Sequence, residues 1–230
     1  MDLRLLSAGA VQRGVETAAA VFEKESGHKI LVNFATAPVI RGKVENQELA
    51  LDLLIAPLET IRDFEKQRLV ASGSSAVVGS VKAAVVVRQG AWQPDISTAE
   101  ALKAELIACE SIVYNQGSSG IFAEELIQRM GIGEVVKAKT LRLADAGAVM
   151  KHLSNHKNTK DIGFGQITAI LLHLEDGVKL VGPLPKEVEN ITTYAAAIAT
   201  RAEAPDLAQR FLRFLITPST QAAFRASGVT

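Results

Sequence analysis

Small and hydroxyl-bearing residues follow several short apolar runs of this sequence, directly before segments with helical periodicity. These stretches are Ser7–Ala10, Ala35–Pro38, Gly117–Gly120, Ala144–Gly147 and Gly165–Thr168. In parallel α/β sheets, ligands bind beyond the carboxyl ends of the strands. The helix N-termini found there offer backbone N–H groups and the positive end of the helix dipole. Small residues let the backbone approach a ligand closely, and hydroxyl groups add donors. The pattern therefore predicts a site for a small oxyanion or carboxylate.

The same residue types also have an ordinary structural use. Ser, Thr and Asp are common helix N-caps, and Gly is common in turns, so any one of these stretches taken alone favours capping. Gly117-Ser118-Ser119-Gly120 is the most specific, because two glycines flank two hydroxyl donors. It lacks the Lys-Ser/Thr ending of a nucleotide-binding P-loop. Asp145 suits a helix cap better than an anion site.

The candidate ligand residues come from four of these stretches and the positions beside them. They are Ser7, Gly9, Ala10, Thr36, Ala37, Pro38, Arg41, Asn115, Ser118, Ser119, Gly120, Ala146 and Gly147. Arg41 follows Pro38 within the first turns of a predicted helix and could make bidentate contacts to a carboxylate. A surface position is the alternative for this arginine. Arg88 and Arg142 are weaker cationic candidates.

Two histidines carry the one pattern that suggests a metal. His152 and His156 are four residues apart and could share a helix face, as metal ligands do. Since no third ligand is evident near them in the sequence, we interpret them as a solvent-exposed helix face and predict no metal site and no cofactor. No paired carboxylates or catalytic triad are recognisable, so the sequence assigns no catalytic residue. The single cysteine, Cys109, excludes an intramolecular disulfide, and its spacing predicts a buried helix position.

The overall charge balance limits the kinds of partner. The 230 residues include 25 Lys plus Arg and 25 Asp plus Glu, so no global field attracts nucleic acid or an anionic membrane surface. The apolar runs are too short to insert into a membrane. The first residues lead straight into a predicted strand without a signal-peptide pattern. Two locations follow as alternatives: periplasmic if a signal peptide was removed, and otherwise cytoplasmic.

Short β-like runs alternate with amphipathic helical segments along the chain, which predicts an α/β fold with parallel sheets. Two longer extended segments, Ala76–Arg88 and Ile191–Thr200, are expected to be crossover strands. We therefore predict two lobes, each a mostly parallel sheet flanked by helices. Residues 1–82 and 194–230 form the first lobe, and residues 83–193 form the second.

Several segments resemble the periplasmic molybdate-binding protein family, which has the type II periplasmic-binding-protein fold. They are Leu6–Val11, Phe22–Lys29, Asp52–Pro57, Ser118–Leu126 and Phe211–Ala222, and the resemblance covers essentially the whole chain. It implies a small anion held in a cleft between two lobes that close by hinge motion at the crossovers. It also implies the membrane component of an ABC-type transporter as partner.

The sequence departs from this family at the ligand loops. The family typically presents a serine where this chain has Ala10, and serines where it has residues 36–38. The backbone N–H groups that the family uses are matched by Ser119–Gly120 and Ala146–Gly147. A tyrosine of the family has no equivalent in residues 164–166. Each lost hydrogen bond to a charged ligand costs about 1.5–3 kcal/mol, so a di- or tricarboxylate rivals molybdate or tungstate.

Three functions remain as alternatives. The favoured one is a solute-binding protein for a transporter. The second is an isomerase of an unsaturated polycarboxylate, because the chain looks like a branch that also resembles aconitate isomerase, which catalyses an allylic proton shift. That reaction needs a base within hydrogen-bond reach of the substrate, and the sequence names none. The third is a cytosolic ligand-sensing module that would need a separate partner protein.

Overall fold

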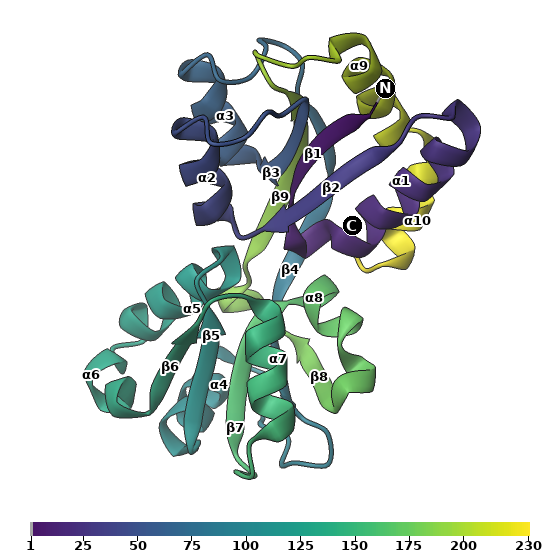
Figure 1. The fold of residues 1–230 in the computed structure, drawn as a ribbon. Coiled ribbons are helices and arrows are strands. Elements are labelled where there is room, and N and C mark those ends of the chain that lie inside the picture. Colours follow the sequence, from purple (N-terminus) through teal and green to yellow (C-terminus); the bar gives the residue numbers. More distant parts are fainter. Residues whose placement is uncertain (1) are drawn as a thin grey trace. The chain divides into compact units, whose positions relative to one another are not determined.

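The computed structural model describes residues 2–230, and the chain divides into two compact units (Figure 1). Unit 1 comprises Met1–Val81 and Thr192–Thr230, and unit 2 comprises Lys82–Ile191. Met1, where the predicted first lobe begins, lies outside the described residues. The chain passes between the units twice, within β4 (Ala76–Arg88) and at the start of β9 (Ile191–Ile198). Each unit is described by itself.

The sheet of unit 1 contains three parallel strands. These are β1 (Leu3–Ala8), β2 (Ile30–Ala35) and β3 (Leu53–Pro57), with β1 in the centre. Ser7 lies opposite Phe34 on one side and Ile55 on the other. β9 pairs with β3 in the antiparallel direction. The carboxyl ends of the three parallel strands therefore share one edge of the sheet.

In unit 1, helices follow β1 and β2 directly at these strand ends. A 3₁₀ turn (Gly9–Val11) leads from β1 into α1 (Gln12–Ser26), and β2 leads through Thr36 into α2 (Ala37–Glu45). The others are α3 (Leu58–Lys66), α9 (Pro205–Leu215) and α10 (Pro218–Ala226). α9 and α10 open with prolines, which need no N–H partner in a first helical turn. Phe22 of α1 packs edge-on against Phe211 of α9, with ring centroids 5.0 Å apart.

A buried ion pair fixes the amino end of β3. Asp52 has no exposed surface and binds the Arg4 side chain, with Oδ2 3.0 Å from Nε. Asp52 also accepts backbone N–H groups of Arg4, Glu203 and Ala204. Burial alone would raise the pKa of Asp52, but these hydrogen bonds outweigh it and lower the pKa below its ordinary value.

Unit 2 repeats the arrangement of three parallel strands. They are β5 (Ser111–Asn115), β6 (Thr140–Leu143) and β7 (Asp161–Gln166), with β5 in the centre. β4 runs antiparallel to β7 and also pairs with β8 (Val178–Pro183). The predicted parallel sheets are thus mixed in both units, because the strands in which the chain changes unit run against their neighbours.

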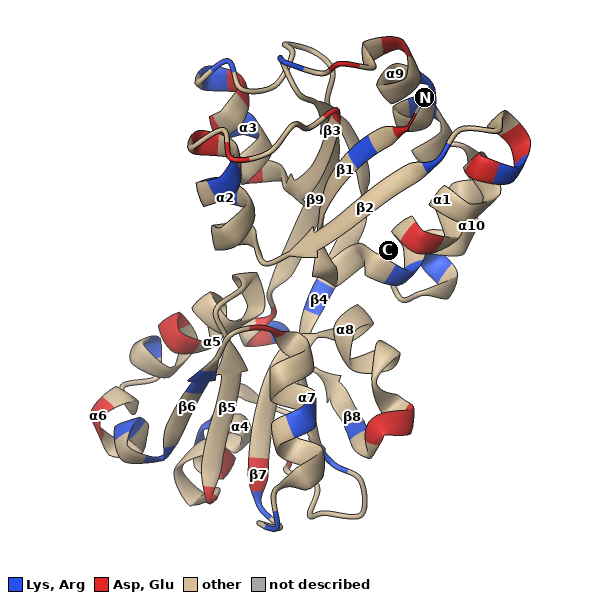
Figure 2. Ribbon diagram, in the orientation of Figure 1, with Lys and Arg blue, Asp and Glu red and all other residues tan. Residues whose placement is uncertain are grey.

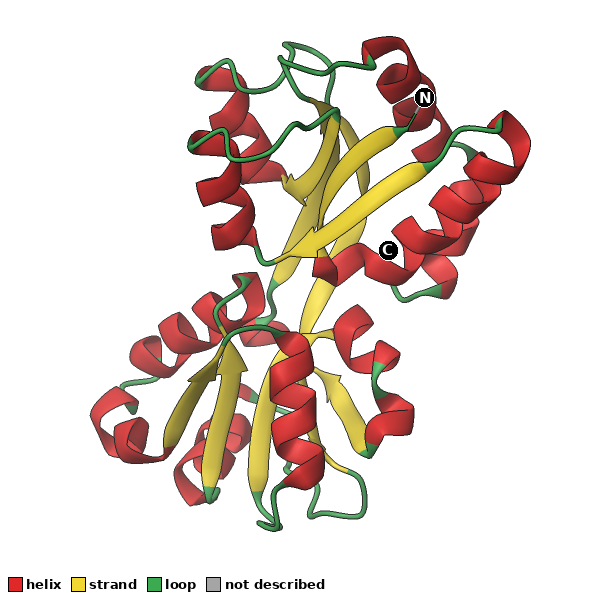
Figure 3. Cartoon of the chain, viewed as in Figure 1, coloured by secondary structure: helices red, strands yellow, loops and turns green. Residues whose placement is uncertain are grey.

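Helices cover both faces of the unit 2 sheet (Figure 3). One apolar cluster joins the sheet to α4 (Ala99–Ala108), α5 (Ser118–Arg129) and the short α6 (Gly133–Val136). The other joins it to α7 (Ala146–Asn155) and α8 (Ile167–Leu172). Successive strand residues point to opposite faces, so Val85 lies in the first cluster and Val86 in the second. Three 3₁₀ turns complete the unit, at Lys137–Lys139, Leu174–Asp176 and Lys186–Val188.

The predicted extended segments and the predicted burial of Cys109 can be compared directly with the structure. β4 spans the predicted segment, whereas β9 ends at Ile198 because the chain turns at Thr200. Cys109 is buried as predicted, although it lies at the C-cap position of α4 and not within the helix. This burial raises the pKa of its thiol.

Charges of both signs are interspersed over the helices of each unit (Figure 2). Among residues 2–230, no helix combines the length and apolar character needed to cross a membrane.

Candidate functional site

In unit 1, the structure brings two of the predicted stretches to adjacent strand ends. Ala8 and Ala35 are register partners at the ends of β1 and β2, so Gly9–Ala10 and Thr36–Pro38 begin from neighbouring positions. Thr36 occupies the N-cap position of α2, yet its side chain makes no capping hydrogen bond. Ser7 is fully buried and donates its hydroxyl to the Ala8 carbonyl at 3.3 Å. The Ser7 hydroxyl is therefore engaged by the chain itself.

Arg41 does not act as the free cation that the sequence suggested. Its guanidinium lies 3.2 Å from Glu45 and 3.0 Å from Asp63, and it stacks over the Phe64 ring at 5.7 Å. Glu45 is one helical turn away on α2, whereas Asp63 belongs to α3. Arg41 thus ties α2 to α3, and its charge is balanced by two carboxylates of the protein. This pairing was not visible in the sequence, because Asp63 is distant along the chain.

The other two arginine candidates, Arg142 and Arg88, differ in their contacts. Arg142 lies on β6 and forms an ion pair with Glu124 of α5, 3.3 Å apart. Arg88 ends β4, and its Nε atom is buried without a hydrogen-bond partner in the described structure. Arg41 and Arg142 are therefore paired with carboxylates of the protein, whereas Arg88 has no such ion pair in the described structure.

In unit 2, Asn115 organises the turn between β5 and α5. It is buried at the end of the strand, and its Oδ1 atom accepts the Gly117 N–H at 2.6 Å. Its Nδ2 group donates to Ser119 Oγ at 3.3 Å. The amide thus fixes both the loop and the first turn of the helix, which positions the predicted residues Ser118–Gly120.

Gly120 is required at its position by close backbone approach. A Cβ atom placed there would lie 1.6 Å from the Asn115 carbonyl oxygen, far inside contact distance. The start of α5 is therefore pressed against the end of β5. Gly117, the N-cap residue of α5, has no side chain to cap the helix. The N-terminus of α5 therefore lies uncapped by a side chain at the strand end, an arrangement that suits an anion, although the Gly120 N–H already donates to the Gly117 carbonyl at 3.1 Å.

Gln166 is a site residue that the sequence did not single out. It ends β7 and is the N-cap residue of α8, and its side chain is buried. Its Nε2 group donates to Ser118 Oγ at 3.4 Å, which links the end of β7 to the start of α5. The available signal in the sequence was its place between a buried strand and a helix.

The third unit 2 stretch is a capped helix start. Asp145 accepts the Ala148 N–H at 2.8 Å, so the predicted capping role of this aspartate is confirmed. Ala146 and Gly147 form the first turn of α7 directly after it. Because β5 pairs with both β6 and β7, the three helix starts of unit 2 follow the same edge of its sheet.

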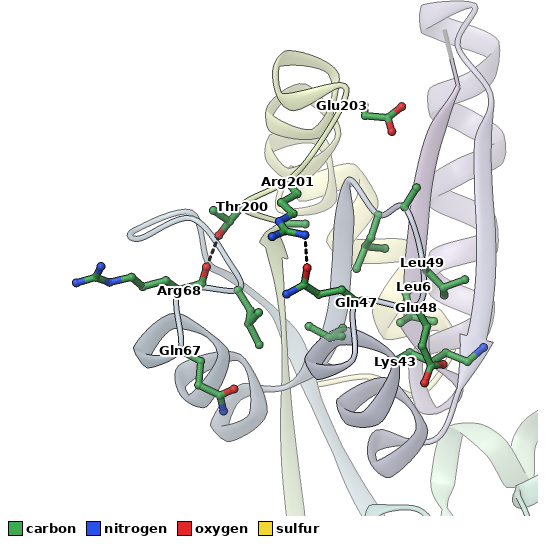
Figure 4. A pocket seen from close by; sticks show the side chains of 15 residues that line it. Leu6, Lys43, Gln47, Glu48, Leu49, Gln67, Arg68, Thr200, Arg201 and Glu203 are labelled. Atoms are coloured by element: carbon green, nitrogen blue, oxygen red, sulfur yellow. Dashed lines mark hydrogen bonds between the residues drawn. The ribbon is translucent and has the colours of Figure 1, made fainter.

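A pocket of about 490 Å³ lies elsewhere in unit 1, and Figure 4 shows the side chains around it. Its walls come from the segments before β3, after α3 and after β9, so it is at the opposite edge from the carboxyl ends of the strands. Arg201 donates to Gln47 across it, and Thr200 donates to the Arg68 carbonyl at 2.8 Å (Figure 4). Gln47 and Arg68 both have positive φ angles. The pocket contains none of the predicted ligand residues.

These features define the class of protein. Parallel strands in each unit lead into helices at one sheet edge, and the chain changes unit in extended segments, which is an α/β periplasmic-binding-protein fold. The chain belongs to the bacterial extracellular solute-binding protein family, whose model matches residues 3–230.

Individual relatives agree with this assignment. The chain is 26% identical over 235 residues to an aconitate isomerase of Pseudomonas sp., covering 99% of this chain and 87% of the relative. The periplasmic molybdate-binding protein of Azotobacter vinelandii has a TM-score of 0.79 at 14% identity, with 99% and 98% of the two chains covered. AgtB of A. tumefaciens R10, solved with agropinic acid, has a TM-score of 0.77 at 14% identity, covering 98% and 81%. These structures establish similarity of fold.

Proposed function

We propose that this solute-binding protein holds a small organic di- or tricarboxylate in a cleft between two lobes. Residues 1–82 and 194–230 would form one lobe, and residues 83–193 the other. The observation that carries the proposal is that α2, after Thr36, and α5, after Gly117, both start at strand ends without a side-chain cap. Backbone N–H groups at such positions favour a negatively charged ligand.

The proposed ligand contacts come from both lobes. Gly9, Ala10 and Thr36–Pro38 supply one side, and Asn115, Ser118–Gly120 and Ala146–Gly147 supply the other. Ser7 would act by shaping the first loop, since its hydroxyl is bonded to Ala8. Arg41 would position α2 through Glu45 and Asp63 rather than contact the ligand.

A carboxylate is favoured over molybdate or tungstate because few side-chain hydroxyls are free to surround a compact tetrahedral ion. Ala10 has none, and the Ser7 hydroxyl already donates to the Ala8 carbonyl. A larger ligand with separated carboxylate groups would need only a few donors at each end. The AgtB structure is consistent with an organic acid as ligand for this fold.

The proposed role is delivery of this ligand to the membrane component of an ABC-type transporter in the periplasm. Membership of an extracellular solute-binding family supports this role. We propose neither contact with nucleic acid nor insertion into a membrane.

A thermal-shift series with citrate, cis-aconitate, molybdate and tungstate tests the ligand class. An anion at a hundred times its dissociation constant stabilises the folded state by about 2.7 kcal/mol, which corresponds to roughly 5–10 °C for a chain of this size. We expect such a shift with a carboxylate. A shift with molybdate or tungstate alone would refute the carboxylate proposal, and calorimetric titration would then give the affinity.

A second candidate is an isomerase of an unsaturated polycarboxylate, favoured by the 26% identity with aconitate isomerase along 99% of the chain. Proton exchange at the carbon next to a carboxyl group of aconitate, followed by NMR in D₂O, tests it directly. Exchange above the protein-free rate would make the protein an enzyme. Binding of aconitate without exchange would leave the transport role.

A further inference from the structure

The carboxyl end of α7 carries two imidazole rings that lie close together. His152 is in the last turns of the helix, and His156 follows it as the C-cap residue, donating its N–H to the His152 carbonyl at 2.9 Å. Residues four apart on a helix share one face. The two ring centroids are 4.8 Å apart, with the ring planes 32° from parallel. Both side chains are partly exposed, so the rings are accessible from solvent.

A buried carboxylate from another element completes this group. Asp161 begins β7, only 3% of its surface is exposed, and its Oδ2 atom lies 2.6 Å from His156 Nδ1. Its Oδ1 atom accepts hydrogen bonds from Ser111 Oγ at 2.7 Å and from Asn158 Nδ2 at 3.2 Å. These bonds hold the carboxylate in place. The Oδ2 atom keeps a lone pair that can bind a further partner.

We propose that His152, His156 and Asp161 bind a divalent transition-metal ion, with Zn²⁺ as the best match. One donor atom from each side chain lies within 4.8 Å of the others. Zn²⁺ takes imidazole nitrogen and carboxylate oxygen at about 2.0–2.2 Å, usually with four ligands in total. Rotation of the two accessible rings towards the fixed Asp161 brings three ligands to the ion, and water fills the fourth position.

The metal site is separate from the proposed anion site. Asp161 is at the amino end of β7, whereas Gln166, which donates to Ser118 of the proposed anion site, is at its carboxyl end. A metal here would join the end of α7 to the start of β7 across the connecting residues 157–160. Its expected effect is stabilisation of unit 2, and it requires no change in anion binding.

Calorimetric titration of tag-free, EDTA-treated protein with ZnCl₂ tests this proposal. We expect one Zn²⁺ per chain at micromolar affinity, together with a higher melting temperature. His152→Ala removes a partly exposed ligand with little expected effect on folding, and it should weaken Zn²⁺ binding at least about tenfold. Asp161→Asn should also weaken binding, and circular dichroism would establish whether that variant remains folded.

His173→Ala provides a matched control. His173 forms a similar pair with a carboxylate, 2.7 Å from Asp176, but it has no place in the three-residue group. This variant should bind Zn²⁺ as the parent protein does. Absence of saturable Zn²⁺ binding, or equal affinity in the His152→Ala variant, would overturn the proposal. Either result would leave the anion-binding proposal intact.

Discussion

Replacing two threonines at helix starts separates ligand binding from helix capping. Thr98 and Thr36 both precede a helix as N-cap residues. Thr98 Oγ1 accepts the Ala101 N–H at 3.1 Å, whereas the Thr36 side chain makes no such bond. The same change to alanine should therefore have different consequences at the two positions.

Thr98→Ala should lower stability without affecting the ligand. Loss of a capping hydrogen bond costs about 0.5–2 kcal/mol, which lowers the melting temperature by roughly 1–8 °C in a chain of this length. Thr36→Ala loses no cap and should stay within about 0.5 kcal/mol of the parent protein. If Thr36 donates its hydroxyl to the anion, the binding free energy should weaken by about 1.5–3 kcal/mol, or roughly 10- to 150-fold in affinity.

The assay is calorimetric titration with whichever of the four anions gives the thermal shift, alongside melting curves of the three proteins without ligand. Two results would refute the reasoning. One is a Thr36→Ala variant that binds as tightly as the parent protein. The other is a Thr98→Ala variant that loses affinity, because Thr98 opens α4 and is not among the proposed ligand residues.

Three further predictions follow from the same geometry. Gly120→Ala should reduce both stability and anion affinity, because its Cβ would meet the Asn115 carbonyl at 1.6 Å; unchanged melting and binding would show that α5 can shift freely. Arg41→Ala should leave anion affinity within about twofold and cost no more than about 1 kcal/mol of stability, because its ion pairs are partly exposed; a tenfold loss of affinity would restore Arg41 as a ligand residue. Asp52→Asn should lower stability at neutral pH and make its decline in acid shallower. The pKa of Asp52 is lower in the folded protein, so its stabilising effect is complete above the unfolded value near 3.9 and is lost as the pH falls through the folded value. Urea unfolding at several pH values measures this, and parallel acid branches for both proteins would contradict it.

Much of the fold was accessible from local patterns. Strand and helix periods differ, and proline and glycine mark where one element gives way to the next. The extended run Ala76–Arg88 and the helix starts after Thr36 and Asp145 are therefore recognisable in the sequence alone. The direction of each strand relative to its neighbours is not, since pairing joins residues far apart in the chain.

For the predicted anion-site stretches, the sequence by itself determined the residue types and their places between strands and helices. Only the tertiary structure decided which of their groups are already engaged. It gave Arg41 the distant partner Asp63, placed Gln166 beside Ser118, and brought Asp161 to His156. Hydrogen bonds and ion pairs depend on distances of about 3 Å between atoms, and folding sets these distances between residues that the sequence separates.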